Sequence, residues 1–217
     1  MINKYLIKYF RNKVYEWSNQ NPINYPWRTT ENLWHAFVAE IMLQRTKAEQ
    51  VLPVYNDFIT RFPSPESYKK HLEKSDENVF ENLGLKWRYE TFKEAVNSIV
   101  EEGMPTYKNY LIKLPGVGEY VSSAIMSFHL NKRELLIDSN IVRFYGRFFG
   151  IKADKESRRK KEFIVLTDQI TPLRNVKKYN YAVLDYSMNI CKPKPVCLTC
   201  LMVKRCHFYK DNTELLK

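Results

Sequence analysis

The sequence predicts an all-α fold. Apolar residues recur at helical spacing through most of the 217 residues, and few stretches alternate between polar and apolar residues. Glycine, which disfavours helix interiors, occurs only six times. Hydrophobic residues make up 44% of the chain, so a core can form without disulfides. We therefore expect helices arranged in one large domain or in two small ones.

The N-terminal segment carries the first helical pattern. Residues 1–17 form an amphipathic repeat whose apolar positions include Phe10 and Trp17. The segment lacks the continuous apolar core and the cleavage site of a signal peptide. A connector rich in Pro and Asn covers 19–30. We expect its last residue, Thr30, to be the N-cap of the next helix.

The rest of the chain shows helical spacing in successive segments. Pro105 and Pro115 bound one short helical stretch. Residues 134–137, ELLI, could pass for a strand, but among so many helices we expect an extended link. The expected helices cover 31–46, 48–62, 64–72, 86–102, 106–114, 122–130, 140–150, 157–170 and 179–191.

The charge balance favours a polyanionic partner. Lys and Arg number 35 against 24 Asp and Glu, which gives a net charge of +11. Each phosphate that a basic surface neutralises releases counterions, so an excess of this size raises the odds of nucleic-acid binding. No apolar run approaches the roughly 20 residues that cross a bilayer. We expect an intracellular, cytoplasmic or nucleoid protein with no membrane partner.

A glycine-rich turn separates two of the expected helices. Residues 114–120 read LPGVGEY, with Gly116 and Gly118 on either side of a valine. Such a stretch can be a tight turn and nothing more. It also leaves backbone N–H groups exposed at the start of the following helix, which favours an anion there.

Four cysteines lie close together near the C-terminus: Cys191, Cys197, Cys200 and Cys206, with gaps of five, two and five residues. In an intracellular protein this spacing predicts a metal site and not disulfides. Four thiolates suit a structural zinc ion and a [4Fe–4S] cluster equally well.

The glycine turn resembles the helix-hairpin-helix motif, which holds one DNA phosphate without reading sequence. Asp138 lies 18 residues after Tyr120, ahead of a basic amphipathic helix. An aspartate at this position is ordinarily an N-cap. In this context, however, LLIDSNIVRFYG resembles the segment holding the essential aspartate of the endonuclease III superfamily of helix-hairpin-helix DNA glycosylases.

This resemblance implies an architecture and a catalytic role. One lobe would cover 25–135 and end in the hairpin, and the other would combine 1–24 with 136–217. Double-stranded DNA with a mismatched or damaged base would lie across the cleft of a monomer, with Tyr120 and Asp138 at its mouth. The charge of Asp138 would stabilise positive charge on the sugar of a flipped-out nucleotide.

The resemblance also implies a cofactor and DNA contacts. The cysteines would hold a [4Fe–4S] cluster, although superfamily members usually show a first gap of six residues; zinc is the alternative. The implied DNA contacts come from the hairpin and from basic residues on the cluster lobe. They are Leu114, Gly116, Val117, Gly118, Arg143, Lys204 and Arg205.

Glu40 stands alone among apolar residues in FVAEIML. Burial would raise the pKa of such a carboxyl group toward a value useful for protonating a base, whereas an exposed helix stripe would leave it ordinary. AEIMLQRT resembles a segment of adenine glycosylases and of mismatch thymine glycosylases. Gln44 and Arg45 would contact DNA near the lesion, with Arg45 as in the thymine branch. Arg45, together with Trp87 or Arg88, would fill the space left by the flipped base or contact the orphan guanine.

Tyr120 occupies the position of the lysine that forms a Schiff base in bifunctional members. A phenol cannot do so, and the mismatch thymine branch has tyrosine there. Adenine glycosylases also usually carry a further domain after the cysteines. We therefore expect a monofunctional glycosylase that removes T or U opposite G. The alternatives are an adenine glycosylase that uses Glu40 and, more distantly, a non-catalytic DNA-binding protein.

Overall fold

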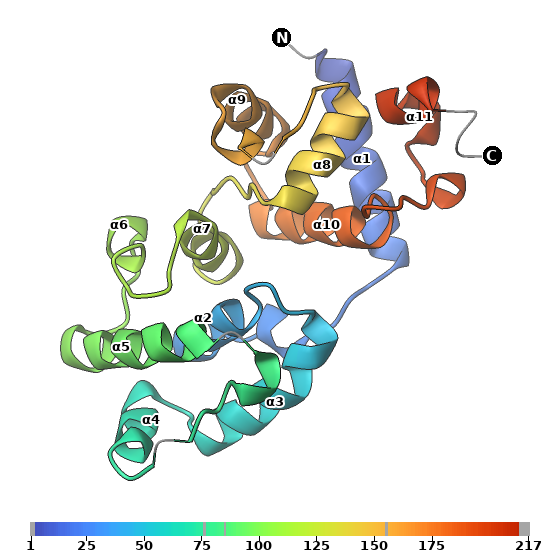
Figure 1. The fold of residues 1–217 in the computed structure, drawn as a ribbon. Coiled ribbons are helices and arrows are strands. Elements are labelled where there is room, and N and C mark those ends of the chain that lie inside the picture. Colours follow the sequence, from blue (N-terminus) through green and yellow to red (C-terminus); the bar gives the residue numbers. More distant parts are fainter. Residues whose placement is uncertain (1–2, 76, 85, 155, 213–217) are drawn as a thin grey trace. The chain divides into compact units, whose positions relative to one another are not determined.

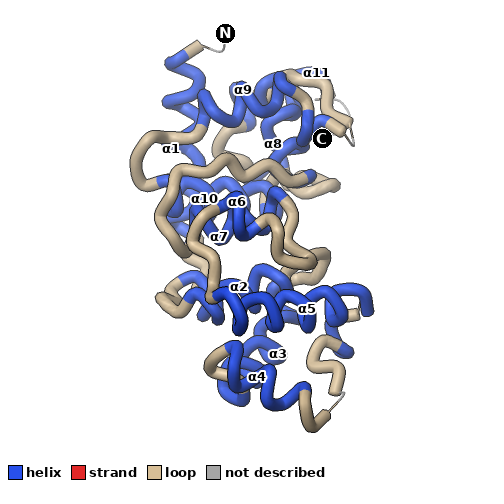
Figure 2. Tube along the Cα trace, turned by 90° about the vertical axis from the view of Figure 1, so that its left-hand side faces the viewer, coloured by secondary structure: helices blue, strands red, loops and turns tan. Residues whose placement is uncertain are grey.

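The computed structural model describes residues 3–75, 77–84, 86–154 and 156–212. Every regular element in these ranges is a helix, which confirms the predicted all-α class (Figures 1 and 2). The chain forms two compact units. Unit 1 combines Met1–Ile23 with Arg133–Lys217, and unit 2 is Asn24–Lys132. The expected bounds of the hairpin lobe, 25–135, differ from unit 2 by one residue and by three.

Unit 2 is built around a helix that is buried almost all round. This helix, α2 (Leu33–Met42), packs against α3 and α7. The rings of Trp34 and Phe37 stack on Phe92, with centroids 5.7 and 6.0 Å apart. The helices of unit 2 are α2, α3 (Ala48–Arg61), α4 (Pro65–Leu72), α5 (Lys86–Glu102), α6 (Lys108–Leu111) and α7 (Glu119–Phe128), with 3₁₀ turns at Pro26–Arg28 and Glu81–Leu83.

The N-cap of α2 is Asn32, and the expectation of Thr30 was wrong. The Asn32 side chain accepts hydrogen bonds from the N–H groups of Trp34 and His35, at 2.9 and 3.3 Å. Thr30 instead accepts from the N–H of Asn32 itself. An Asn side chain thus satisfies two of the free donors at the start of the helix, which a threonine two residues earlier cannot reach.

Unit 1 packs the N-terminal helix against the C-terminal half of the chain. The first helix, α1 (Lys4–Gln20), lies along α10 (Val176–Asn189). Its fully buried Phe10 contacts the rings of Phe144 and Phe148, with centroids 5.1 and 5.0 Å apart. The other helices are α8 (Ser139–Phe149), α9 (Lys161–Ile170) and α11 (His207–Asp211), with 3₁₀ turns at Ser157–Arg159, Cys197–Thr199 and Val203–Arg205.

Several helices begin or end away from their predicted bounds. The short helix expected at 106–114 is reduced to α6, Lys108–Leu111. The helix expected from residue 122 begins at Glu119, because Gly118 is its N-cap and the helix follows the glycine turn directly. Residues 134–137 have no regular structure, as expected for an extended link. In the described residues, no helix is both long and apolar enough to cross a membrane.

Gly146 lies inside α8, where alanine would normally be the better helix former by about 1 kcal/mol. A Cβ at this position would meet the carbonyl oxygen of Ile151 at 2.8 Å and the Cβ of Ala153 at 3.2 Å. Because the first contact is with backbone, we expect Gly146→Ala to lower the free energy of unfolding by about 2 kcal/mol net. Denaturant titration followed by circular dichroism would measure the change.

The matched control is Asn97→Ala on the exposed side of α5. This change adds helix propensity without a contact, so it should leave stability equal or slightly higher. A Gly146→Ala variant as stable as the Asn97→Ala variant would contradict the packing argument.

Candidate functional site

The glycine turn joins α6 to α7. Gly116 has φ +78°, a conformation that residues with a side chain rarely adopt. A Cβ there would also lie 2.8 Å from the hydroxyl oxygen of Thr91, so the turn sits directly against α5. Gly118 is the exposed N-cap of α7 and provides no side-chain cap. The first turn of α7 therefore presents backbone N–H groups and the positive end of the helix dipole at the surface.

Leu114 and Val117 differ from the two glycines. Both side chains are only 7% exposed and belong to the core of unit 2. The N–H of Val117 donates to the carbonyl of Leu114 at 3.0 Å, so it is engaged within the turn. Because both side chains are buried, a DNA contact at these two positions would have to come from the backbone. Their visible role is to anchor the turn.

The segment after α2 lies beside this turn. The side-chain amide of Gln44 donates to the carbonyl of Gly116 at 2.9 Å. Arg45 follows with φ +57°, a left-handed conformation that is uncommon for arginine, and its side chain is exposed. The structure thus brings together the two segments of unit 2 that were predicted to touch DNA.

Arg88 cannot fill a space in DNA, and that expectation was wrong. Its side chain is fully buried. The guanidinium donates to the carbonyls of Met42 and Gln44, at 2.7 and 2.8 Å, and to that of Leu83 at 2.8 Å. Desolvation lowers the pKa of Arg88. Trp87, in contrast, is 43% exposed at the start of α5.

Glu40 lies in the middle of α2 and is only 6% exposed. Of the two alternatives for this carboxyl group, burial or an exposed helix stripe, the structure has burial. Its Oε1 lies 3.6 Å from Nε2 of His129, the C-cap residue of α7. The imidazole is also buried, and neither of its nitrogens has a hydrogen-bond partner among the described residues. A buried carboxyl group and a buried imidazole therefore face each other inside unit 2.

Tyr120 lies in the first turn of α7, two residues after Gly118. Its side chain is half-buried and packs against the core of unit 2. The ring of Tyr120 therefore packs against the core and stays partly exposed next to the glycine turn.

Asp138 is the N-cap of α8, as its place in the sequence suggested. Its Oδ1 accepts from the N–H of Ile141 at 2.7 Å, and its Oδ2 accepts from the side-chain amide of Asn140 at 2.9 Å. The residue is only half-buried. Two donors thus hold the carboxylate in one orientation while part of it stays accessible.

Asn140 connects this carboxylate to the cysteine segment. Its side-chain oxygen accepts from Nη2 of Arg143 at 3.1 Å. Arg143 also donates to the carbonyls of Ser187 and Cys191, at 3.0 and 2.8 Å. The guanidinium predicted to contact DNA is therefore engaged inside unit 1, where it links Asp138, through Asn140, to the end of α10.

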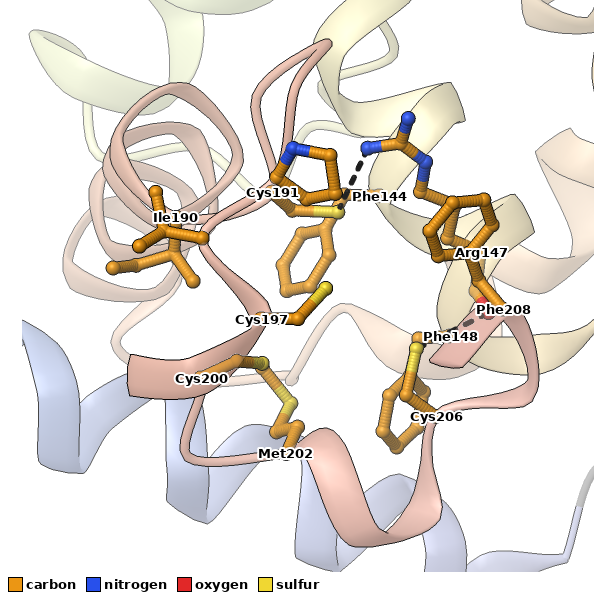
Figure 3. A pocket seen from close by; sticks show the side chains of 12 residues that line it. Phe144, Arg147, Phe148, Ile190, Cys191, Cys197, Cys200, Met202, Cys206 and Phe208 are labelled. Atoms are coloured by element: carbon orange, nitrogen blue, oxygen red, sulfur yellow. Dashed lines mark hydrogen bonds between the residues drawn. The ribbon is translucent and has the colours of Figure 1, made fainter. Parts of the chain in front are cut away.

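The four cysteines line one pocket (Figure 3). All four are free thiols of intermediate burial. The hydroxyl of Tyr186 lies 3.2 Å from Cys200 Sγ, and Arg147 Nη1 lies 3.8 Å from Cys191 Sγ. The apolar part of the lining comes from Phe144, Phe148, Ile190, Pro195, Val196, Met202 and Phe208.

Four cysteine sulfurs around one pocket supply the type of donor that a metal group held by thiolates requires. Burial raises the pKa of Cys191, Cys197 and Cys206, for Cys206 to about 11. Thiolates at these positions therefore need nearby positive charge. At Cys191 the guanidinium of Arg147 provides it and lowers the pKa of the thiol, against the effect of burial. In the described part of the chain, no group of three or more His, Cys, Asp and Glu side chains is placed to hold a metal ion.

The basic residues of the cysteine segment are exposed. Lys204 and Arg205 lie in the 3₁₀ turn before Cys206. The Arg205 guanidinium stacks on the rings of Tyr5 and Tyr9 of α1, 5.0 and 4.9 Å from their centroids. Arg205 thus fastens the segment to α1 while remaining at the surface.

The sequence prediction omitted three site residues. Asn140 and His129 carry no motif of their own, and only the fold brings them to Asp138 and Glu40. Arg147 belongs to the basic helix after Asp138, but its donation to the carbonyls of Lys192 and Pro193, at 2.8 and 3.0 Å, depends on tertiary packing. The one available signal was spacing, because Arg143 and Arg147 lie one helical turn apart.

Known proteins resemble this chain over most of its length. It is 31% identical over 194 residues to an adenine DNA glycosylase of Buchnera aphidicola, covering 87% of this chain but only 56% of that protein. It is 28% identical over 208 residues to a thymine/uracil-DNA glycosylase of Methanothermobacter thermautotrophicus, covering 94% of both. No protein-family model matches the chain.

A solved structure supports the same assignment. A thermostable thymine-DNA glycosylase superposes with a TM-score of 0.82 at 27% identity, over 95% of this chain and 97% of that one. The helices, the glycine turn, the capped aspartate and the cysteine segment occur here in the order that the resemblance implied. In sequence and in fold the chain resembles thymine/uracil and adenine DNA glycosylases, which are helix-hairpin-helix proteins.

Proposed function

We propose that the protein is a monofunctional DNA glycosylase that hydrolyses the N-glycosidic bond of T or U opposite G in double-stranded DNA. The observation that carries this proposal is the carboxylate of Asp138, which is half-buried and held by two hydrogen bonds. The end-to-end match to a thymine/uracil-DNA glycosylase favours a pyrimidine as the excised base.

Asp138 supplies charge where the reaction develops it. As the bond between C1′ and the base breaks, its electron pair leaves with the base and the sugar becomes positively charged. A fixed carboxylate stabilises that charge without having to reorganise. A water oxygen then bonds to C1′, and the proton that this water loses neutralises the departed base. The products are a free base and an abasic site.

Unit 2 supplies contacts to the DNA backbone and to the site of the flipped base. The exposed N–H groups at the start of α7 suit one phosphate, with Gly116 and Gly118 allowing its close approach. Arg45 is an exposed cation next to this turn and can donate to the O6 and N7 atoms of an unpaired guanine. Lys204 and Arg205 would add phosphate contacts from unit 1.

Tyr120 limits the reaction to hydrolysis. An amine at this position would attack C1′, form a Schiff base and lead to strand cleavage. A phenol oxygen cannot form that intermediate. The strand should therefore remain intact and carry an abasic site.

The cysteines would hold a [4Fe–4S] cluster with a structural role, through Cys191, Cys197, Cys200 and Cys206. When bound, the cluster would cross-link the segment 191–206 through the four cysteine sulfurs. Arg143 and Arg147 hold the same segment without the cluster, because both donate to backbone carbonyls of that segment. This bracing also acts on Asp138, since Asn140 lies between Arg143 and that carboxylate.

Adenine excision is the second candidate, and one observation favours it. Glu40 is buried, which suits a carboxyl group that protonates a leaving base. A relative at 31% identity is an adenine DNA glycosylase. The chain spans about half the length of that relative.

The substrate can be tested on labelled duplexes that hold G:T, G:U, A:G or A opposite 8-oxoguanine. We expect the strand with T or U to break only after hot alkali, because a monofunctional enzyme leaves an alkali-sensitive abasic site. Loss of adenine instead would replace the pyrimidine assignment. Breakage without alkali would contradict the role given to Tyr120.

Asp138→Asn should reduce the single-turnover excision rate at least ~100-fold while leaving duplex binding in place, since the amide keeps the shape but loses the charge. The matched control is Asp168→Asn on α9, whose carboxylate forms an exposed ion pair with Arg133 at 2.8 Å. That change should alter the rate by less than about two-fold. Comparable rates for both variants would remove Asp138 from the mechanism.

The metal group can be identified on protein purified without oxygen. We expect broad absorption near ~400 nm and about four iron atoms per chain, as four thiolates around a [4Fe–4S] cluster imply. Cys197→Ser should abolish both signals, because one of the four ligands is lost. A colourless protein with one zinc ion per chain would refute the cluster.

A further inference from the structure

Arg88 forms an unusual contact set for a buried charge. The side chain is 0% exposed, yet the acceptors that surround it are carbonyl and hydroxyl oxygens. Nη1 donates to the oxygens of Met42, Gln44 and Thr46, at 2.7, 2.8 and 3.0 Å. The carbonyl groups at the end of α2 carry the negative pole of the helix dipole, which partly compensates the charge.

The guanidinium also ties two loops together. Nη2 donates to the carbonyls of Leu83 and Gly84, at 2.8 and 3.1 Å, in the 3₁₀ turn before α5. Nε has no partner among the described residues. A buried arginine of this kind adds little net stability, because desolvation costs about as much as the contacts return. Its visible effect is to select one conformation of the residues around it.

The conformation selected is that of Arg45. Its two neighbours, Gln44 and Thr46, each give an oxygen to the same nitrogen of Arg88. Between them Arg45 adopts φ +57°, a left-handed conformation that a residue with a side chain keeps only where the surroundings impose it. Arg88 holds the residues on both sides of Arg45, whose own side chain is exposed.

The same segment is joined to the glycine turn. Gln44 donates its side-chain amide to the carbonyl of Gly116 at 2.9 Å. Thr91, less than one turn after Arg88 on α5, occupies the space that a side chain at position 116 would need. Arg88 and Thr91 thus position Arg45 and the phosphate-binding turn from a single helix.

We propose that Arg88 is a positioning residue for opposite-base recognition, which acts through Arg45 and never touches DNA. The proposal rests on the proposed function, in that Arg45 contacts the guanine opposite the excised base. It predicts that the preference for guanine over adenine in the opposite strand depends on both arginines together. It further predicts that each arginine is without effect on this preference once the other is removed.

The test is a double-mutant cycle on DNA binding. The probes are duplexes with a tetrahydrofuran abasic-site analogue opposite G or opposite A, and the readout is the ratio of the two Kd values. We expect Arg45→Ala and Arg88→Met each to reduce the G preference about ten-fold, and the double variant to reduce it no further. Losses that multiply in the double variant would overturn the proposal, as would a wild-type protein without G preference.

Further variants separate positioning from folding. Arg88→Lys keeps the charge but cannot reach acceptors in two loops, so it should not restore the preference. Thr46→Val keeps the shape and removes one acceptor, so a protein of near wild-type melting temperature should still lose part of the preference, about three-fold. Arg61→Met, which removes an exposed charge paired with Glu77 in the same unit, is the matched control and should leave the ratio unchanged.

The two hypotheses fail in different ways. A wild-type protein that excises no T or U, but whose G preference requires Arg45 and Arg88 jointly, would refute the proposed substrate and retain the positioning role. Excision of T or U with independent effects of the two arginines would do the reverse.

Discussion

Arginine side chains that donate to carbonyl groups at the ends of helices are the interaction on which both units depend. A helix leaves its last four carbonyls without partners, and a guanidinium brings up to five donors in a fixed plane. In unit 2, Arg88 takes the carbonyls that follow α2. In unit 1, Arg143 takes those of Ser187 and Cys191 at the end of α10.

These two helix ends are the places where functional segments begin. The chain that leaves α2 becomes the turn with Arg45, and the chain that leaves α10 becomes the cysteine segment. Neither segment contains an α-helix or a strand, and the cysteine segment has only the 3₁₀ turns Cys197–Thr199 and Val203–Arg205. The guanidinium groups of Arg88 and Arg143 therefore hold the backbone at the point where each α-helix stops. The cost is desolvation of a charge, which an ordinary apolar core would avoid.

The carboxylate of Asp138 also lies at a helix end. Asp138 begins α8 and satisfies its free N–H groups, so the requirement for an N-cap and the requirement for a fixed charge are met by the same side chain. Asn140 and Arg143, two and five residues after Asp138, extend this arrangement to Cys191. A metal group bound to the cysteines would consequently stiffen the surroundings of Asp138 without taking part in bond breaking.

The sequence by itself determined the helical class, the order of the helices, the glycine turn and the capped aspartate, because each depends on contacts within a few residues. It also favoured burial of Glu40, since apolar residues flank it on both sides in FVAEIML, and the structure excluded the exposed stripe. Only the tertiary structure decided that Arg88 is internal, that His129 faces Glu40 and that Arg143 turns inward to Cys191. Those outcomes join residues 44 to 89 positions apart, and local spacing carries no information on such pairs.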